Sequence, residues 1–146
     1  MRWSIVIPAL NERRTLRALV EQLLLLCPDV IVVDDGSTDG TFESLDGLAI
    51  TLVRHASRQG KGAALRDGFA VALAHRAQAV MTMDADGQHA PGDVRRLIAA
   101  WHEHPQSIVI GGASVASRNV ISSSSISSTE DGVEVNGTNT NNNAIK

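Results

Sequence analysis

Two carboxylates, Asp84 and Asp86, stand one residue apart at the end of an apolar run. If residues 79–83 form a buried strand, both carboxylates emerge at its carboxyl end, where open α/β sheets bind their ligands. Carboxylates at this spacing can converge on one hard cation, Mg²⁺ or Mn²⁺, that keeps positions open for substrate phosphates. The spacing alone is also typical of solvated acidic loops, and the strand before it is what favours a metal site.

Two further loops, at residues 8–12 and 34–39, follow predicted strands upstream. Because the carboxyl ends of parallel strands meet at one edge of a sheet, all three loops are expected to lie together. Glu12 and Asp35 could accept hydrogen bonds from a base N–H group or from ribose hydroxyls, since ionised carboxylates only accept. Glu12 could instead stabilise the start of a helix. Asp39 is assigned to the start of the next helix and not to the site.

A lysine flanked by glycines, Gly60-Lys61-Gly62, opens a clear helical pattern. It could bring a cation and free N–H groups to a diphosphate at the amino terminus of that helix. It is not a P-loop, which requires an earlier glycine and a hydroxyl residue after the lysine. Lys61 could instead be a solvated turn residue. Arg66, one turn further on, could face the same ligand or lie on the surface. His89 could ligate a metal or be exposed. The remaining histidines show no metal-ligand spacing among themselves: His55, His75, His102 and His104.

Short apolar runs alternate with helical patterns along residues 3–110. The runs at 3–8, 30–33, 49–53, 79–83 and 107–110 predict strands. Apolar residues at helical spacing predict helices at 16–24, 38–45, 60–74 and 91–101, with Asn11 as a helix cap. The alternation, together with continuously apolar strands, predicts an α/β fold in which a mostly parallel, twisted sheet has helices on both faces.

Composition limits the classes of function. The 146-residue chain is 43% hydrophobic and carries a formal net charge of −3, which disfavours a nucleic-acid-binding protein. A single cysteine, Cys27, cannot form an intrachain disulfide and fits a reducing, cytoplasmic location. Since no apolar run reaches the roughly 20 residues needed to cross a bilayer, we expect no membrane span. The amino terminus does not resemble a signal peptide.

The alternating pattern ends near residue 113, so residues 1–113 are expected to form one α/β domain. Residues 114–146 are rich in serine and asparagine and lack a periodic apolar face, which predicts a flexible, low-complexity tail. The sharp change in composition indicates a truncated or altered reading frame, or an appended tail.

Four motifs, in order, resemble those of the family 2 glycosyltransferases, over about residues 3–112. They are Ser4-Ile-Val-Ile-Pro-Ala-Leu-Asn-Glu12, Val32-Val-Asp-Asp-Gly-Ser-Thr-Asp-Gly-Thr41, Gly60-Lys61-Gly62 and Met83-Asp-Ala-Asp-Gly-Gln-His89. The resemblance implies a GT-A fold, a Rossmann-like domain for a nucleotide-diphosphate sugar, over residues 1–113. The last two motifs are most similar to the polyprenyl-phosphate (dolichyl-phosphate) mannose synthase-like branch.

The resemblance also implies roles for individual residues. The residues that would bind the donor nucleotide are Pro8, Ala9, Glu12 and Asp35, with Lys61 and Asp84 at the diphosphate. The residues that would surround Mg²⁺ or Mn²⁺ are Asp84, Asp86 and Gln88. It further implies a GDP- or UDP-sugar donor, a lipid-linked acceptor such as a polyprenyl phosphate, and peripheral association with the cytoplasmic face of the membrane.

The function that follows is metal-dependent transfer of a sugar from a nucleotide-diphosphate donor. The acceptor-binding half of the family's domain would normally follow the fifth strand, where this chain has its Ser/Asn-rich segment, so no catalytic base is assigned. The alternative is a catalytically incomplete nucleotide-sugar-binding fragment or a partner-dependent subunit. A nucleotidyltransferase is disfavoured because residues 9–12, Ala-Leu-Asn-Glu, lack the glycine- and arginine-rich loop of that class.

Overall fold

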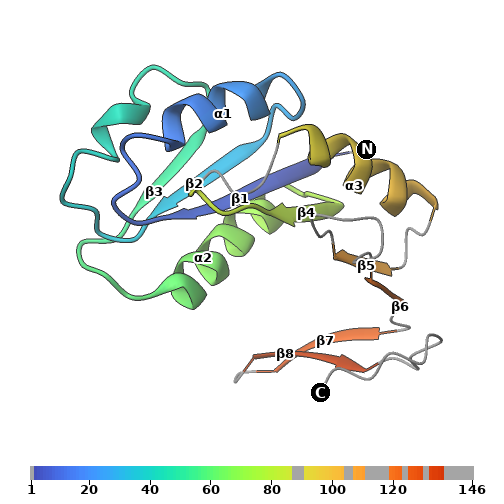
Figure 1. Ribbon diagram of the computed structural model, residues 1–146. Helices are drawn as coiled ribbons and strands as arrows, with labels where there is room; N and C mark the ends of the chain where they lie inside the picture. Colours follow the sequence, from blue (N-terminus) through green and yellow to red (C-terminus); the bar gives the residue numbers. More distant parts are fainter. Residues whose placement is uncertain are drawn as a thin grey trace. The chain divides into compact units, whose positions relative to one another are not determined.

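The computed structural model describes residues 2–86, 91–103, 107–110, 119–122, 125–129 and 132–136 (Figure 1). The chain divides into two compact units, Met1–Pro91 and Gly92–Lys146. Within the described residues, the first unit holds a four-stranded sheet, and the second holds a helix and two strand pairs.

All four strands of the first unit run parallel, in the order β3-β2-β1-β4. They are β1 (Trp3–Ala9), β2 (Val30–Asp34), β3 (Thr51–Arg54) and β4 (Ala79–Thr82). β1 is central, because Ile5 aligns with Val30 on one side and with Met81 on the other. Every residue of β2 is buried, as expected for a parallel strand covered on both faces. The predicted parallel α/β fold is confirmed.

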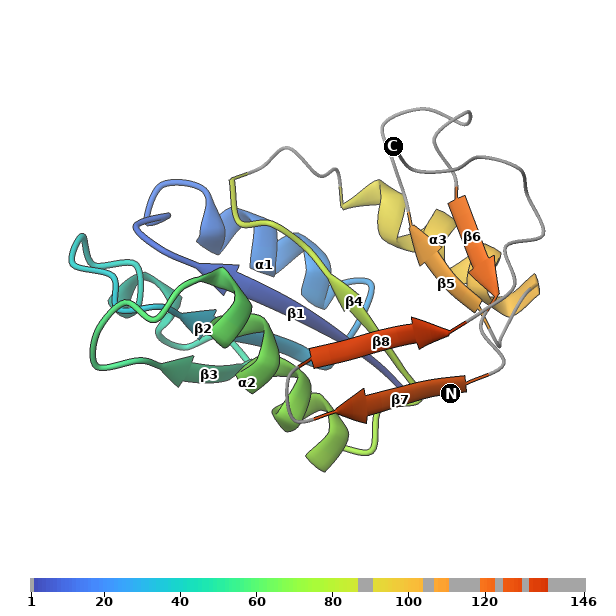
Figure 2. The same cartoon turned by 90° about the horizontal axis from the view of Figure 1, so that it is seen from below.

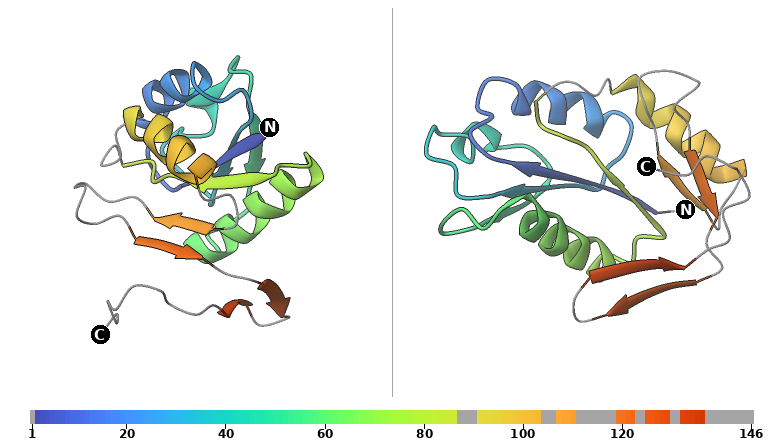
Figure 3. Two further views of the ribbon diagram at one scale, coloured as in Figure 1. Left: turned by 90° about the vertical axis from the view of Figure 1, so that its right-hand side faces the viewer. Right: turned by 60° about the horizontal axis from the view of Figure 1, so that its bottom comes forward.

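Two helices of the first unit, α1 (Leu16–Leu24) and α2 (Lys61–Ala74), lie on opposite faces of this sheet (Figure 2, Figure 3). Val6 of β1 and Val33 of β2 form an apolar cluster with Ala64 and Ala72 of α2. Neighbouring residues of a strand point to opposite faces, so the buried Ile5, Ile7 and Val32 of β1 and β2 form an apolar layer on the face that carries α1. The buried side chains of α1 are Leu16, Leu19, Val20 and Leu23. The helices predicted at 16–24 and 60–74 are confirmed.

α2 approaches the sheet closely at Gly68, which is buried. A Cβ atom on this residue would stand well inside van der Waals contact with Cγ1 of Val6, and 3.3 Å from Cγ2 of Val33. Glycine leaves room for the sheet here, although in a helix interior it costs about 0.5–1 kcal/mol relative to alanine. The close docking of α2 therefore depends on this residue.

The helix predicted at 38–45 is wrong in its first half, because the structure forms only a short 3₁₀ helix there, η1 (Glu43–Leu45). The residues before η1 form a turn around Asp39. Its carboxylate accepts hydrogen bonds from the backbone N–H of Thr41 (2.9 Å) and from the Thr41 hydroxyl (2.5 Å). The side chain of Asn11 accepts the N–H of Thr38 (3.0 Å), so Asn11 joins this turn and does not cap α1. Side chains that bond nearby backbone groups compete with helix formation.

The second unit contains α3 (Gly92–Glu103), which confirms the helix predicted at 91–101 and contacts β5 (Ser107–Ile110). β5 is a strand, as predicted, but its described partner is the antiparallel β6 (Asn119–Ser122) and not the parallel sheet. The short connection between them suits antiparallel neighbours, since a parallel crossover needs a dozen or more residues. β7 (Ser125–Thr129) and β8 (Gly132–Asn136) also pair antiparallel. The boundary at residue 113 and the flexible tail stay predictions.

Candidate functional site

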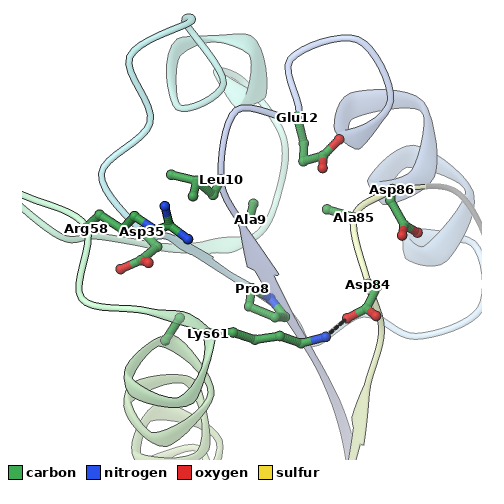
Figure 4. A pocket seen from close by; sticks show the side chains of 11 residues that line it. Pro8, Ala9, Leu10, Glu12, Asp35, Arg58, Lys61, Asp84, Ala85 and Asp86 are labelled. Carbon is green, nitrogen blue, oxygen red and sulfur yellow. Dashed lines mark hydrogen bonds and ion pairs between the residues drawn. The ribbon is translucent and has the colours of Figure 1, made fainter.

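A pocket of about 230 Å³ opens at the carboxyl ends of β1, β2 and β4 (Figure 4). The residues that line it are Pro8, Ala9, Leu10, Glu12, Asp35, Arg58, Lys61, Ala64, Asp84, Ala85 and Asp86. The fold therefore brings together the site residues predicted from separate loops of the sequence. The exception is Gln88, which lies outside the described residues together with His89. The roles of the lining residues stay predictions.

Three carboxylates, those of Glu12, Asp84 and Asp86, gather on one side of the pocket (Figure 4). Glu12 belongs to the loop after β1, and the two aspartates belong to the loop after β4. The Thr15 hydroxyl donates to the carbonyl of Ala85 (2.9 Å) and so ties these two loops together. This bond helps to hold the carboxylates on one wall.

The ammonium of Lys61 lies 2.6 Å from Oδ1 of Asp84. Lys61 is the first residue of α2, and Gly60 before it has φ +99°, a conformation that favours glycine. The two side chains are 61% and 39% exposed, so solvent screens the pair and it contributes little to stability. The lysine can therefore exchange this partner for an oxygen of an anionic ligand.

Asp84 and Asp86 fit a hard divalent cation by their ligand chemistry. Carboxylate oxygens suit Mg²⁺ and Mn²⁺, and Mg²⁺ is commonly held by one or two carboxylates together with substrate phosphates. Across the part of the chain that the structure describes, no three or more His, Cys, Asp or Glu side chains are grouped to hold a metal ion. The pocket thus offers a carboxylate pair, and phosphate oxygens would have to supply further ligands.

Asp35, directly after β2, is buried, with 3% of its surface exposed. Its Oδ1 accepts hydrogen bonds from Nδ1 of His55 (2.7 Å) and from the N–H of Gln59 (2.8 Å), and its Oδ2 accepts the N–H of Gly60 (2.8 Å). Burial raises the pKa of Asp35, but these hydrogen bonds outweigh it and hold the pKa below its usual value. A carboxylate has about four acceptor sites, so about one remains for a ligand.

His55 directly follows β3 and is buried, with 6% of its surface exposed. Its Nδ1 contacts Asp35, and its Nε2 lies 3.0 Å from Oδ2 of Asp67 in α2. The hydrogen bond with Asp35 is the main cause that raises the pKa of His55; burial opposes it and Asp67 reinforces it. His55 was not predicted as a site residue, because its partners lie 20 and 12 residues away along the chain. Its position at the carboxyl end of a parallel strand, where α/β sheets bind ligands, could have indicated that it lies near the site.

Arg58 also lines the pocket and was not predicted from the sequence. Its backbone N would stand 2.7 Å from a Cβ atom on Gly36, whose φ is +77°. Glycine at this position lets the loop after β2 touch the loop before α2 through their backbones. Figure 4 shows Arg58 beside Asp35, across the pocket from the carboxylate wall. Arg58 and Lys61 supply two positive charges for contact with an anionic ligand, while four carboxylates line the same pocket: Glu12, Asp35, Asp84 and Asp86.

The parallel sheet, with acidic and basic side chains at its carboxyl edge, has the GT-A glycosyltransferase fold. The chain superposes on glucosyl-3-phosphoglycerate synthase from Mycobacterium tuberculosis, whose structure is in complex with Mn²⁺, UDP-glucose and phosphoglyceric acid. The TM-score is 0.62 and the sequence identity is 25%. The superposition covers 77% of this chain and 45% of that one. It superposes on mannosyl-3-phosphoglycerate synthase from Rubrobacter xylanophilus with a TM-score of 0.64 and 20% identity, over 76% and 39% of the two chains, a likeness of fold alone.

The chain belongs to glycosyl transferase family 2, whose sequence model matches residues 4–135. It is 39% identical over 107 residues to the polyprenol monophosphomannose synthase of Mycolicibacterium smegmatis, covering 68% of this chain and 40% of that protein. It is 31% identical over 114 residues to the dolichol-phosphate mannosyltransferase of Saccharomyces cerevisiae, covering 70% and 42%. The chain thus spans about 40% of the length of these relatives. The family and branch predicted from the motifs are confirmed.

Proposed function

We propose that the chain binds a nucleotide-diphosphate sugar together with Mg²⁺ or Mn²⁺ and supplies the donor site for sugar transfer to a polyprenyl phosphate. The observation that carries the proposal is one pocket lined by residues of separate loops that were each predicted to bind donor or metal. The names of the two relatives, a polyprenol monophosphomannose synthase and a dolichol-phosphate mannosyltransferase, support it, as does the structural likeness to an enzyme in complex with Mn²⁺ and UDP-glucose.

The nucleoside of the donor, from GDP- or UDP-sugar, would bind along the loops after β1 and β2. Glu12 and the remaining acceptor site of Asp35 would take hydrogen bonds from base N–H groups or ribose hydroxyls. Pro8 and Ala9 would line the surface beneath the nucleoside. This half of the pocket would orient the donor so that its diphosphate points toward Asp84 and Asp86.

The diphosphate would bind between α2 and the loop after β4. Lys61 would leave Asp84 and donate to a phosphate oxygen at the amino terminus of α2, where backbone N–H groups favour anions. Asp84 and Asp86, with Gln88 beyond the described residues, would hold the cation. When bound there, the cation would neutralise negative charge that develops on the departing nucleotide.

A lipid phosphate is the proposed acceptor because it needs no general base. The second pKa of a phosphate monoester is about 6, so its oxygen is already ionised at neutral pH, whereas a hydroxyl acceptor needs a base to remove its proton. With a lipid acceptor, the chain would associate peripherally with a membrane, and we propose its cytoplasmic face. Among the described helices, none combines the length and the apolar character needed to span a bilayer.

Calorimetry with GDP and UDP, in Mg²⁺, in Mn²⁺ and in EDTA, tests the donor site. We expect affinity to fall by about tenfold or more in EDTA, because the cation joins the carboxylates to the diphosphate. Equal affinity with and without EDTA would contradict the metal role. Sugar transfer by the purified chain, lost in Asp84→Ala, would support the full reaction. Binding without transfer would favour a nucleotide-sugar-binding unit that acts with a partner.

Lys61→Met is expected to weaken GDP binding by about tenfold or more, because a charge-assisted hydrogen bond to phosphate is worth roughly 1.5–3 kcal/mol. The loss should be smaller for GMP, which lacks the second phosphate. Arg14→Met removes the same charge from an exposed residue outside the pocket lining and serves as the control. Titration of both variants with both nucleotides checks the prediction, and an equal loss for GMP and GDP would contradict a diphosphate contact.

A further inference from the structure

His55 lies between two carboxylates that come from different elements. Its Nδ1 is 2.7 Å from Oδ1 of Asp35, and its Nε2 is 3.0 Å from Oδ2 of Asp67. A neutral imidazole has one N–H donor, and ionised carboxylates only accept. Both short contacts can therefore be hydrogen bonds only when the ring carries two protons, as an imidazolium.

The charged groups around this ring come from three elements. The end of β2 supplies Asp35 and Asp34, whose carbonyl accepts the backbone N–H of His55 (2.9 Å). α2 supplies Asp67, whose other oxygen, Oδ1, lies 3.1 Å from Nε of Arg66. β3 supplies Arg54, which pairs with the Asp34 carboxylate (3.5 Å). Among the described residues, the two arginines pair with Asp34 and with the far oxygen of Asp67, and His55 lies between the facing oxygens of Asp35 and Asp67. Arg58 lies beside Asp35 in the pocket (Figure 4).

Loss of one ring proton would break this bridge on one side. A ring nitrogen without its proton presents a lone pair to a carboxylate oxygen, which is repulsive in a buried site. The contact with Asp35 is the shorter and more buried of the two, so a neutral ring keeps its proton on Nδ1 and loses the contact with Asp67, which fixes the ring against Asp35. Asp35 in turn accepts the N–H groups of Gln59 and Gly60. Gly60 directly precedes Lys61 and the start of α2. The ring is thus connected, through the carboxylate of Asp35, to the backbone that directly precedes Lys61 in the pocket.

We propose that His55 is a positioning residue: doubly protonated, it holds Asp35 and, through it, the backbone of residues 59–60 in the arrangement that binds the donor nucleotide. This inference rests on the proposed function and adds a pH dependence to it. The pKa of His55 is raised above its ordinary value of about 6.5. The bridge from the doubly protonated ring to Asp35 and Asp67 is therefore fully present below a pH of about 6.5. It is lost as pH rises through the raised pKa, and nucleotide affinity falls with it.

The test compares the wild-type chain with Asp67→Asn, a change at a half-buried position outside the pocket lining. GDP affinity in Mg²⁺ is measured by calorimetry across about pH 6 to 9, the range in which a perturbed histidine titrates. We expect the wild-type affinity to fall by about tenfold across the titration of His55. Removing the Asp67 charge should lower the midpoint by about one pH unit or more. Glu21→Gln removes a carboxylate from the exposed face of α1 and should leave the midpoint unchanged.

Nuclear magnetic resonance on the nucleotide-free chain separates this inference from the proposed function. The ring nitrogens of His55 and the backbone amides of Gln59 and Gly60 should shift with one common midpoint, which moves down in Asp67→Asn. Amides that stay unchanged while His55 titrates would overturn the positioning role, even if GDP binds. An affinity midpoint that Asp67→Asn does not move would overturn it as well. Failure to bind GDP or UDP at any pH, with the common midpoint intact, would instead contradict the donor site.

Discussion

Asp86→Ala is expected to lower the affinity for GDP and UDP in Mg²⁺ by about 100-fold or more. A cation held by this carboxylate and by phosphate oxygens contributes several kcal/mol, and each 1.4 kcal/mol is a factor of about ten. Asp86 is exposed at the pocket, so its replacement should change the free energy of unfolding by about 0.5 kcal/mol at most. Calorimetry, with a thermal unfolding curve of the same sample, checks both expectations.

The residual affinity of the Asp86→Ala variant gives a sharper comparison. If the carboxylate acts through the cation, the variant in Mg²⁺ should bind GDP about as weakly as the wild-type chain does in EDTA. Asp46→Ala removes the same charge from an exposed position outside the pocket lining and should leave affinity unchanged. An Asp86→Ala variant that binds within about twofold of wild type in Mg²⁺ would exclude Asp86 as a metal ligand.

Gly68→Ala is expected to lower the free energy of unfolding by about 2 kcal/mol. The added methyl group would overlap Cγ1 of Val6, a fully buried residue of the central strand, and overpacking of this kind costs about 1–3 kcal/mol. The steric cost has to exceed the gain of about 0.5–1 kcal/mol that alanine brings to a helix interior. Urea unfolding followed by circular dichroism measures the difference.

Gly62→Ala provides the matched control in the same helix. A Cβ atom at Gly62 meets nothing within 4 Å, and its backbone does not have a positive φ. This substitution should therefore leave the free energy of unfolding unchanged or raise it by up to about 1 kcal/mol. If Gly68→Ala lowers the free energy of unfolding and Gly62→Ala does not, the loss of stability comes from the contact between residue 68 and Val6. If Gly68→Ala is as stable as Gly62→Ala, the sheet tolerates a side chain at this position.

The parallel sheet could be predicted because its strands are continuous apolar runs, each followed by a polar loop. The same runs predicted the site, since Asp35 directly follows β2 and Asp84 lies two residues after β4, and both strands end at one edge of the sheet. The helix predicted at 38–45 failed because Asp39 and Asn11 bond backbone groups around Thr41 and Thr38. Helical spacing of apolar residues does not reveal such turns, because they depend on a loop about 27 residues earlier.

The unpredicted part of the site consists of residues whose importance arises from contacts across the fold. His55 has no metal-ligand spacing, and its two carboxylate partners come from β2 and α2. Arg58 reaches the pocket because the loop before α2 crosses over Gly36. Asp35 was predicted as an acceptor for the donor, whereas most of its acceptor sites bind the chain itself. These contacts depend on how the loops pack, which neither composition nor periodicity records.

The order of the strands has a consequence for the order of folding. The central strand, β1, comes first along the chain, yet one of its two neighbours, β4, follows about 76 residues later. Contacts of such long sequence separation form slowly, so one edge of β1 stays open until β4 has docked. The loop that carries Asp84 and Asp86 follows β4, the last strand of this sheet along the chain, so the pocket is complete only when β4 is in place. An intermediate without β4 would present an unpaired apolar edge and no cation site, which makes nucleotide binding a measure of complete folding of the first unit.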